Sequence, residues 1–242
     1  MVSLKRRYSR EPVLKLILVV GCILAAVILA AYAVRLAGIT TAKNVGGQAD
    51  EGFILIDPGH GGADGGASAA DGTLEKDVNL AISLPLADML RFLGYPVELT
   101  RETDCSIHDP DVTTLKNQKV SDMKNRLRLY NASRMTISIH ENQFPQTQYF
   151  GTQIFYGTNS GESKLLADCV RTSVIGLLQP DNTRELKKGT KDIYLLHNAQ
   201  VPVILVECGF LSNTGELQKL KDPSYQQSMA YAIVGGVLAY GA

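Results

Sequence analysis

Three apolar segments, each leading to an ionisable side chain, constrain the fold of this chain more than any other feature. Each has the length and composition of a buried β-strand, and the first runs into a glycine-rich turn. The segments are residues 53–57, followed by His60, residues 135–140, ending in His140, and residues 203–207, ending in Glu207. In open α/β sheets, ligands bind beyond the carboxyl ends of the strands. We therefore expect these three side chains to converge at one edge of a sheet.

Segments with helical periodicity alternate with the strands. The apolar spacing predicts helices at about residues 74–93, 121–132, 162–178 and 224–240, and further strands at 97–100, 151–156 and around 193–196. Residues 135–140 alternate apolar and polar side chains, which predicts a strand with one buried face. The pattern indicates an α/β fold: a single three-layer domain over residues 52–242, with a mostly parallel or mixed central sheet flanked by helices.

The amino-terminal segment has the pattern of a membrane-targeting helix. An apolar run at residues 16–34 follows a basic flank made of Lys5, Arg6, Arg7 and Arg10. The run is about long enough to cross a bilayer as a helix, which favours an anchor over a cleaved signal peptide. We expect residues 1–35 to be the flank and anchor and residues 36–51 a linker. The folded domain would then lie outside the cytoplasm, either tethered to the membrane or secreted after cleavage.

Charge and cysteine content exclude two classes of protein. Six of the 24 basic residues, but only one of the 24 acidic residues, lie in residues 1–35, so the remaining chain is mildly acidic. A nucleic-acid partner would need a basic face, and none is evident. Cys22 lies in the apolar run, which leaves three cysteines outside it. An odd number cannot pair completely, so we expect packed free thiols rather than a disulfide framework.

The histidines suggest a metal site. Zinc in hydrolases is commonly held by three protein ligands, for example two histidines and a glutamate, with a fourth position open to water. His60 and His140 could supply the imidazoles. Glu75 could supply the carboxylate, because it follows the glycine-rich turn at the start of a helix that Thr73 would cap. Glu207 also needs a partner or a chemical task, since burying an unpaired carboxylate costs several kcal/mol.

Four blocks in this order resemble the zinc-dependent N-acetylmuramoyl-L-alanine amidases of the amidase-3 family, over about residues 52–241. The blocks are residues 56–62 with Asp64, Gly66 and Ala67; residues 75–80; residues 138–140 with Asn142; and residues 206–207 with 209–213. The resemblance implies zinc ligation by His60, Glu75 and His140, with Glu207 as the catalytic carboxylate.

Other positions are assigned more coarsely. Arg101 and Asn142 are candidates for holding substrate or bracing the site. Glu141 should point away from His140 if the strand continues, so it is not counted as a ligand. His108 and His197 lack a strand-end setting, and we expect no site role for them. Gln143 stands where the family usually has a small residue.

The resemblance implies a peptidoglycan hydrolase that cleaves the amide between N-acetylmuramic acid and the L-alanine of the stem peptide. An anchor with one catalytic domain is similar to the short amidases that trim spore-cortex peptidoglycan, which would act in the bacterial envelope or the forespore intermembrane space; vegetative wall turnover is the other setting. An activating protein partner is left open. A catalytically silent peptidoglycan-binding module and a phosphate-binding α/β protein are the alternatives, although the turn lacks the Lys-Ser/Thr of a P-loop.

Overall fold

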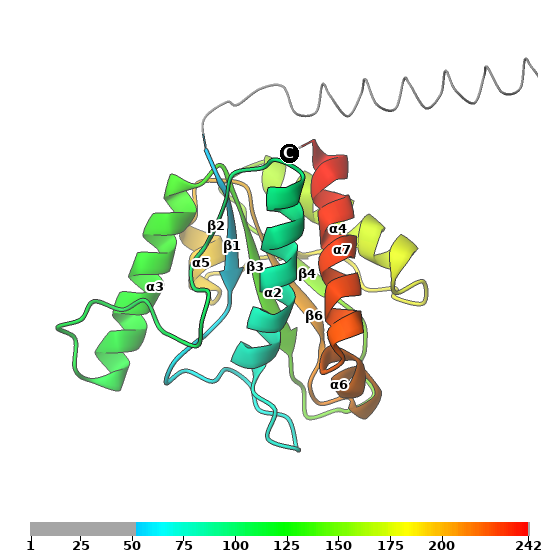
Figure 1. The fold of residues 1–242 in the computed structure, drawn as a ribbon, viewed down its shortest axis with the longest axis horizontal. Helices are drawn as coiled ribbons and strands as arrows, with labels where there is room; N and C mark the ends of the chain where they lie inside the picture. Colours follow the sequence, from blue (N-terminus) through cyan, green and yellow to red (C-terminus); the bar gives the residue numbers. More distant parts are fainter. Residues whose placement is uncertain (1–51, 242) are drawn as a thin grey trace, which may run out of the picture. The chain divides into compact units, whose positions relative to one another are not determined.

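A six-stranded mixed sheet forms the centre of the computed structural model, which describes residues 52–241 (Figure 1). The strands are β1 (Ile54–Pro58), β2 (Val97–Leu99), β3 (Met135–Asn142), β4 (Gln153–Tyr156), β5 (Lys187–Lys188) and β6 (Val203–Phe210). Their order is β2-β1-β3-β6-β4-β5. The first four strands in this order run parallel, whereas β4 is antiparallel to β6. The expected α/β domain with a mixed sheet is confirmed.

Helices cover both faces of the sheet (Figure 1). The helices α2 (Glu75–Phe92), α4 (Glu162–Leu177) and α7 (Pro223–Tyr240) pack together on one face. The helices α3 (Leu115–Ala132) and α5 (Tyr194–Asn198) contact each other on the opposite face. A short helix, α6 (Thr214–Leu220), lies between β6 and α7 in the chain. The central strands are therefore enclosed on both sides.

Alternate residues of the central strands belong to two separate apolar clusters. Ile54 and Ile56 of β1 pack in the larger cluster, with α2, α4 and α7, whereas Leu55 packs in the smaller one, with α3 and α5. The polar residues of β3 are buried as well, since Thr136 and Ser138 are almost inaccessible to solvent. The prediction that this strand has one buried face is thus wrong, because its polar face is covered by α3 and α5.

Several predicted boundaries differ from the structure. Residues around 193–196 form α5 rather than a strand, and α3 begins at Leu115, where Thr114 caps it, rather than at residue 121. Leu74, not Thr73, is the N-cap of α2, and it makes no side-chain capping bond. The backbone instead holds this end, because the Ala67 carbonyl accepts a hydrogen bond from the Glu75 amide at 2.9 Å.

Three cysteines in the described residues are free thiols. The prediction of free thiols is confirmed for these three residues. Cys208 is fully buried as expected, whereas Cys169 is half-buried and Cys105 is exposed. The proposed anchor and linker, residues 1–51, lie outside the described residues. Within residues 52–241, no helix combines the length and apolar character that crossing a membrane requires.

Candidate metal centre

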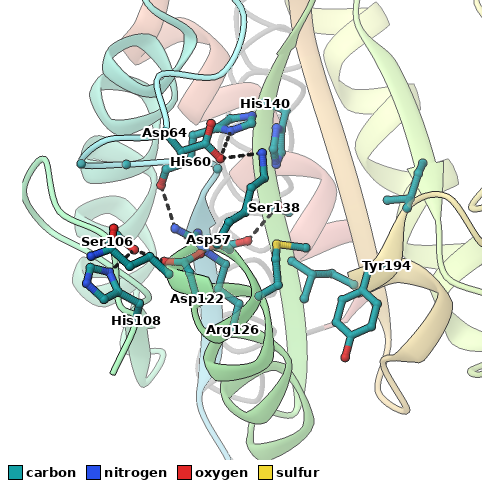
Figure 2. Close-up of a pocket in the computed structure, with 18 of the residues that line it drawn as sticks. Asp57, His60, Asp64, Ser106, His108, Asp122, Arg126, Ser138, His140 and Tyr194 are labelled. Carbon is teal, nitrogen blue, oxygen red and sulfur yellow. Dashed lines mark hydrogen bonds and ion pairs between the residues drawn. The ribbon is translucent and has the colours of Figure 1, made fainter. Parts of the chain in front are cut away.

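His60, Glu75 and His140 come together at the carboxyl ends of β1 and β3. One potential ligand atom from each lies within 4.8 Å of the others. The Glu75 carboxylate faces both imidazoles, with Oε2 at 3.3 Å from His60 Nε2 and Oε1 at 2.9 Å from His140 Nδ1. Figure 2 shows the two histidines on the same wall of a pocket. The strand-end pattern thus predicted the meeting of His60 and His140, and the position of Glu75 at a helix start after the glycine-rich turn predicted its place beside them.

Backbone amides and imidazoles keep the Glu75 carboxylate ionised. Its oxygens accept hydrogen bonds from the amides of Ala67, at 2.8 Å, and Glu141, at 3.2 Å. Burial acts to raise the pKa of Glu75, but hydrogen bonds and charge interactions with His140 and His60 outweigh it and hold the pKa well below its usual range. A charged carboxylate between two imidazoles is a donor set suited to a divalent metal.

The turn that carries His60 is fixed by side chains from other elements. His60 has a φ of 62°, in the left-handed region that few side chains other than glycine adopt. Arg101 donates to the carbonyls of Pro58 and Gly59, both at 3.0 Å. Arg126 of α3 donates to the His60 carbonyl at 2.7 Å. These contacts hold the turn in a conformation that the sequence alone would disfavour.

Arg101 and Asn142 differ in their surroundings. Arg101 is buried, and besides the two turn carbonyls it donates to those of Thr103 and Lys76. Its guanidinium is thus occupied with bracing the backbone. Asn142, at the end of β3, is half-buried, and its carbonyl accepts a hydrogen bond from the Leu211 amide at 2.8 Å.

A buried ionic network beneath the turn was not found by sequence reasoning. Asp57 is inaccessible to solvent and accepts hydrogen bonds from the side chains of Arg126, Thr100, Tyr130 and Ser138. Burial acts to raise the pKa of Asp57, but Arg126 and the hydroxyl donors prevail and lower it to about 2. The signal available in sequence was an aspartate closing a buried strand, which requires a partner.

Glu207 lies beside His140 in the sheet. The two residues are register partners on neighbouring parallel strands, so their side chains project from the same face. Glu207 Oε2 is buried and has no hydrogen-bond partner in the described part of the chain. Burial raises the pKa of Glu207 to about 7. A carboxyl group with this pKa can exchange a proton near neutral pH.

The residues after His140 point in different directions. Glu141 is buried, and burial together with the nearby carboxylates of Glu207 and Glu75 raises its pKa well above the usual range. Its carboxyl group is absent from the His60, Glu75 and His140 cluster, as the strand alternation predicted. Gln143 donates to the Ser68 carbonyl at 2.8 Å, which ties the end of β3 to the loop before α2.

A cavity of about 520 Å³ adjoins the metal-ligand candidates (Figure 2). His60 and His140 line one end, and side chains of α3 and α5, including Met123 and Tyr194, line the walls. His108 also lines it, held by Ser106 Oγ at 2.9 Å, although no site role was expected for it. His197, by contrast, is exposed on α5. A cavity of this size suits a small ligand or part of a larger one.

Two glycines leave room for the cluster. A Cβ atom at Gly59 would overlap the imidazole ring of His140, and one at Gly66 would overlap the carboxylate of Glu75 and the ring of His60. Both positions therefore require glycine for the three side chains to meet. With two imidazoles, one charged carboxylate and a neighbouring unpaired glutamate, the residues present fit a catalytic zinc site.

Comparisons with known proteins all give one class of enzyme. Residues 54–239 match the N-acetylmuramoyl-L-alanine amidase family. The germination-specific N-acetylmuramoyl-L-alanine amidase of Bacillus subtilis is 36% identical over 190 residues, which cover 78% of this chain and 79% of that protein. The CwlD amidase of Clostridioides difficile, solved in complex with the GerS lipoprotein, superposes with a TM-score of 0.74 at 39% identity, covering 78% of this chain and 98% of CwlD. An N-acetylmuramoyl-L-alanine amidase from Clostridium difficile 630 has a TM-score of 0.69 at 30% identity, over 79% of this chain and 97% of that one.

Proposed function

Because the chain belongs to the amidase-3 family of N-acetylmuramoyl-L-alanine amidases, we propose that this peptidoglycan amidase works with a zinc ion held by His60, Glu75 and His140. The scissile bond is the amide between N-acetylmuramic acid and the L-alanine of the stem peptide. The observation that carries the zinc proposal is the Glu75 carboxylate, charged and facing both imidazoles beside Glu207. Family membership also favours an enzyme over a phosphate-binding protein.

Glu207 is the proton carrier in this proposal. A bound zinc ion would polarise the amide carbonyl and lower the pKa of a water molecule toward neutrality. Glu207 accepts the proton of the attacking water on its unpaired oxygen and returns it to the departing amine. Its pKa of about 7 suits both steps, because at neutral pH the carboxyl group can accept a proton and release it again at little cost in free energy.

The remaining side chains position the reactants. Arg101 and Arg126 keep the His60 turn in place through its carbonyls. We keep Asn142, half-buried at the end of the strand that carries His140, as a candidate for contacting substrate. We assign the cavity between α3 and α5 to one part of the substrate, because it opens beside both histidines.

The test is to replace Glu207 with glutamine. Glu207→Gln should keep its zinc and its fold but lose about 10²- to 10⁴-fold in turnover, since the amide is nearly isosteric and cannot carry the proton. Zinc content, thermal melting and release of stem peptides would be measured on one preparation. Glu98→Gln, on the exposed side of β2, is the matched control and should remain active. Near-wild-type cleavage by Glu207→Gln would refute the assignment, and loss of zinc would make Glu207 a ligand.

The relatives and the amino-terminal pattern support a proposal for the place of action. We assign the enzyme to spore-cortex peptidoglycan, outside the cytoplasm, with residues 1–35 as its membrane anchor. Protease added to spheroplasts should then digest the domain, and full protection would contradict this topology. Digesting purified cortex and vegetative peptidoglycan with the enzyme would separate the two substrates, and preferential release of stem peptides from vegetative wall would refute the cortex assignment.

A lipoprotein partner is a further part of this proposal. The CwlD structure is that of a complex with the GerS lipoprotein. We expect a comparable partner to bind this domain, which size-exclusion chromatography with a candidate lipoprotein would detect as a joint peak.

A further inference from the structure

The imidazole of His60 contacts two carboxylates, Glu75 through one ring nitrogen and Asp64 through the other. Nε2 faces Glu75. Nδ1 lies 3.2 Å from Asp64 Oδ2, and Figure 2 shows Asp64 beside His60. The same Asp64 oxygen lies 3.1 Å from Nζ of Lys119, on α3. We propose that Asp64 is a positioning residue that sets the tautomer and donor strength of His60 for zinc, and that Lys119 holds Asp64 in place. This inference rests on the zinc role proposed above.

The chemistry of imidazole explains the role. A neutral histidine carries its proton on one ring nitrogen and offers a lone pair on the other. A carboxylate beside Nδ1 holds the proton there, which leaves Nε2 free to bind metal and makes it a stronger donor. Asp64 itself is oriented, because Oδ1 accepts a hydrogen bond from the Gly66 amide at 3.3 Å. The ring of His60 is thereby fixed from the side away from Glu75.

His140 is held in a different way. Its Nδ1 faces Glu75, and within residues 52–241 no carboxylate lies within ion-pair distance of its Nε2. The ring packs against the backbone of Gly59, where a Cβ atom would overlap it. Steric packing therefore orients His140, whereas Asp64 and Lys119 orient His60 on a turn with a left-handed φ. Loss of Asp64 should then act on metal binding specifically.

The experiment measures zinc affinity of the full chain by competition with a chelator. Asp64→Ala should weaken binding about 10- to 100-fold, as removal of carboxylates behind ligating histidines generally does. Asp64→Asn keeps the shape and an acceptor without the charge, so its loss should be smaller. Lys119→Ala should cost at most about fivefold, because Lys119 is 63% exposed and such ion pairs are screened.

Asp104→Ala is the matched control. Asp104 accepts a hydrogen bond from the Gly62 amide at 2.8 Å and pairs with Lys76, so it orders the same loop without touching a ligand. We expect its zinc affinity to stay within about twofold of wild type. The absorption spectrum of the Co²⁺-substituted protein should change in the Asp64 variants and not in Asp104→Ala, since only the Asp64 variants change a group that contacts the ligand His60.

Two results would overturn the inference. One is an Asp64→Ala affinity within twofold of wild type, and the other is an equal loss in Asp104→Ala, which would mean that loop order alone matters. Melting of the metal-free variants shows whether they fold, and the near-isosteric Asp64→Asn gives the answer if Asp64→Ala does not. Wild-type protein that binds no zinc would refute the proposed function itself, so the two failures are distinguishable.

Discussion

Arg126 is the residue whose loss should most damage the fold around the site. Its buried guanidinium donates to Asp57 and Asp122 and to the carbonyls of Pro58 and His60. Arg126→Met keeps the length of the side chain but leaves the Asp57 charge buried with hydroxyl donors alone. Breaking a buried pair in this way costs about 3–5 kcal/mol. Since domains of this kind are stable by about 5–15 kcal/mol, the variant should lose a large part of its stability.

Urea unfolding at pH 7 measures this loss, and a double-mutant cycle assigns it to the pair. Asp57→Asn removes the buried charge, so adding Arg126→Met to it should cost at least about 1 kcal/mol less than Arg126→Met alone. Arg128→Met is the control on the same helix. Arg128 is exposed and lies 3.9 Å from Asp109, so its loss should change the free energy of unfolding by less than about 0.5 kcal/mol.

The reasoning would be refuted by an Arg126→Met variant that loses less than about 1 kcal/mol, or by strictly additive effects of the two substitutions. Either result would mean that Asp57 does not depend on Arg126 for its charge.

Two further predictions concern acid stability and the turn. The folded pKa of Asp57, about 2, lies below its unfolded value of 3.8, so ionised Asp57 stabilises the fold by about 2 kcal/mol above pH 4, and this is lost as the pH falls from about 4 to 2. Urea unfolding across this range should show the free energy of unfolding of the wild type falling with pH. The same fall in Asp57→Asn would disprove the assignment to Asp57. Gly59→Ala should lose zinc and activity, because the added Cβ atom would overlap the His140 ring. Gly161→Ala is the control and should retain both, because there is open space around Gly161. An active, zinc-loaded Gly59→Ala enzyme would contradict the packing described.

Sequence patterns predicted the strands of the site well because each strand end combines two independent signals. A buried apolar run followed by His60, His140 or Glu207 indicates both a strand and a chemical task, and the structure brings these residues to one edge of the sheet. The residues around 193–196 carried only a short apolar run, which suits a strand or a helix equally, and they form α5.

The network around Asp57 could not be predicted for a different reason. The alternation in β3 looked like a strand with a solvent face, but Ser138 points at Asp57 beneath α3. Arg126 meets Asp57 across 69 positions of the chain, a pairing that depends on how α3 packs over β1. Local periodicity contains no information about such contacts, so they emerge only from the assembled layers.

The side chains that hold the His60 turn come from parts of the chain that are synthesised after it. Arg101 follows β2, Arg126 belongs to α3, and Glu207 lies within β6. A chain synthesised from its amino end therefore contains His60 well before the groups that hold its turn and before Glu207, the proposed base. If Glu207 is the base, as proposed, hydrolysis requires nearly the whole domain to have been synthesised and folded.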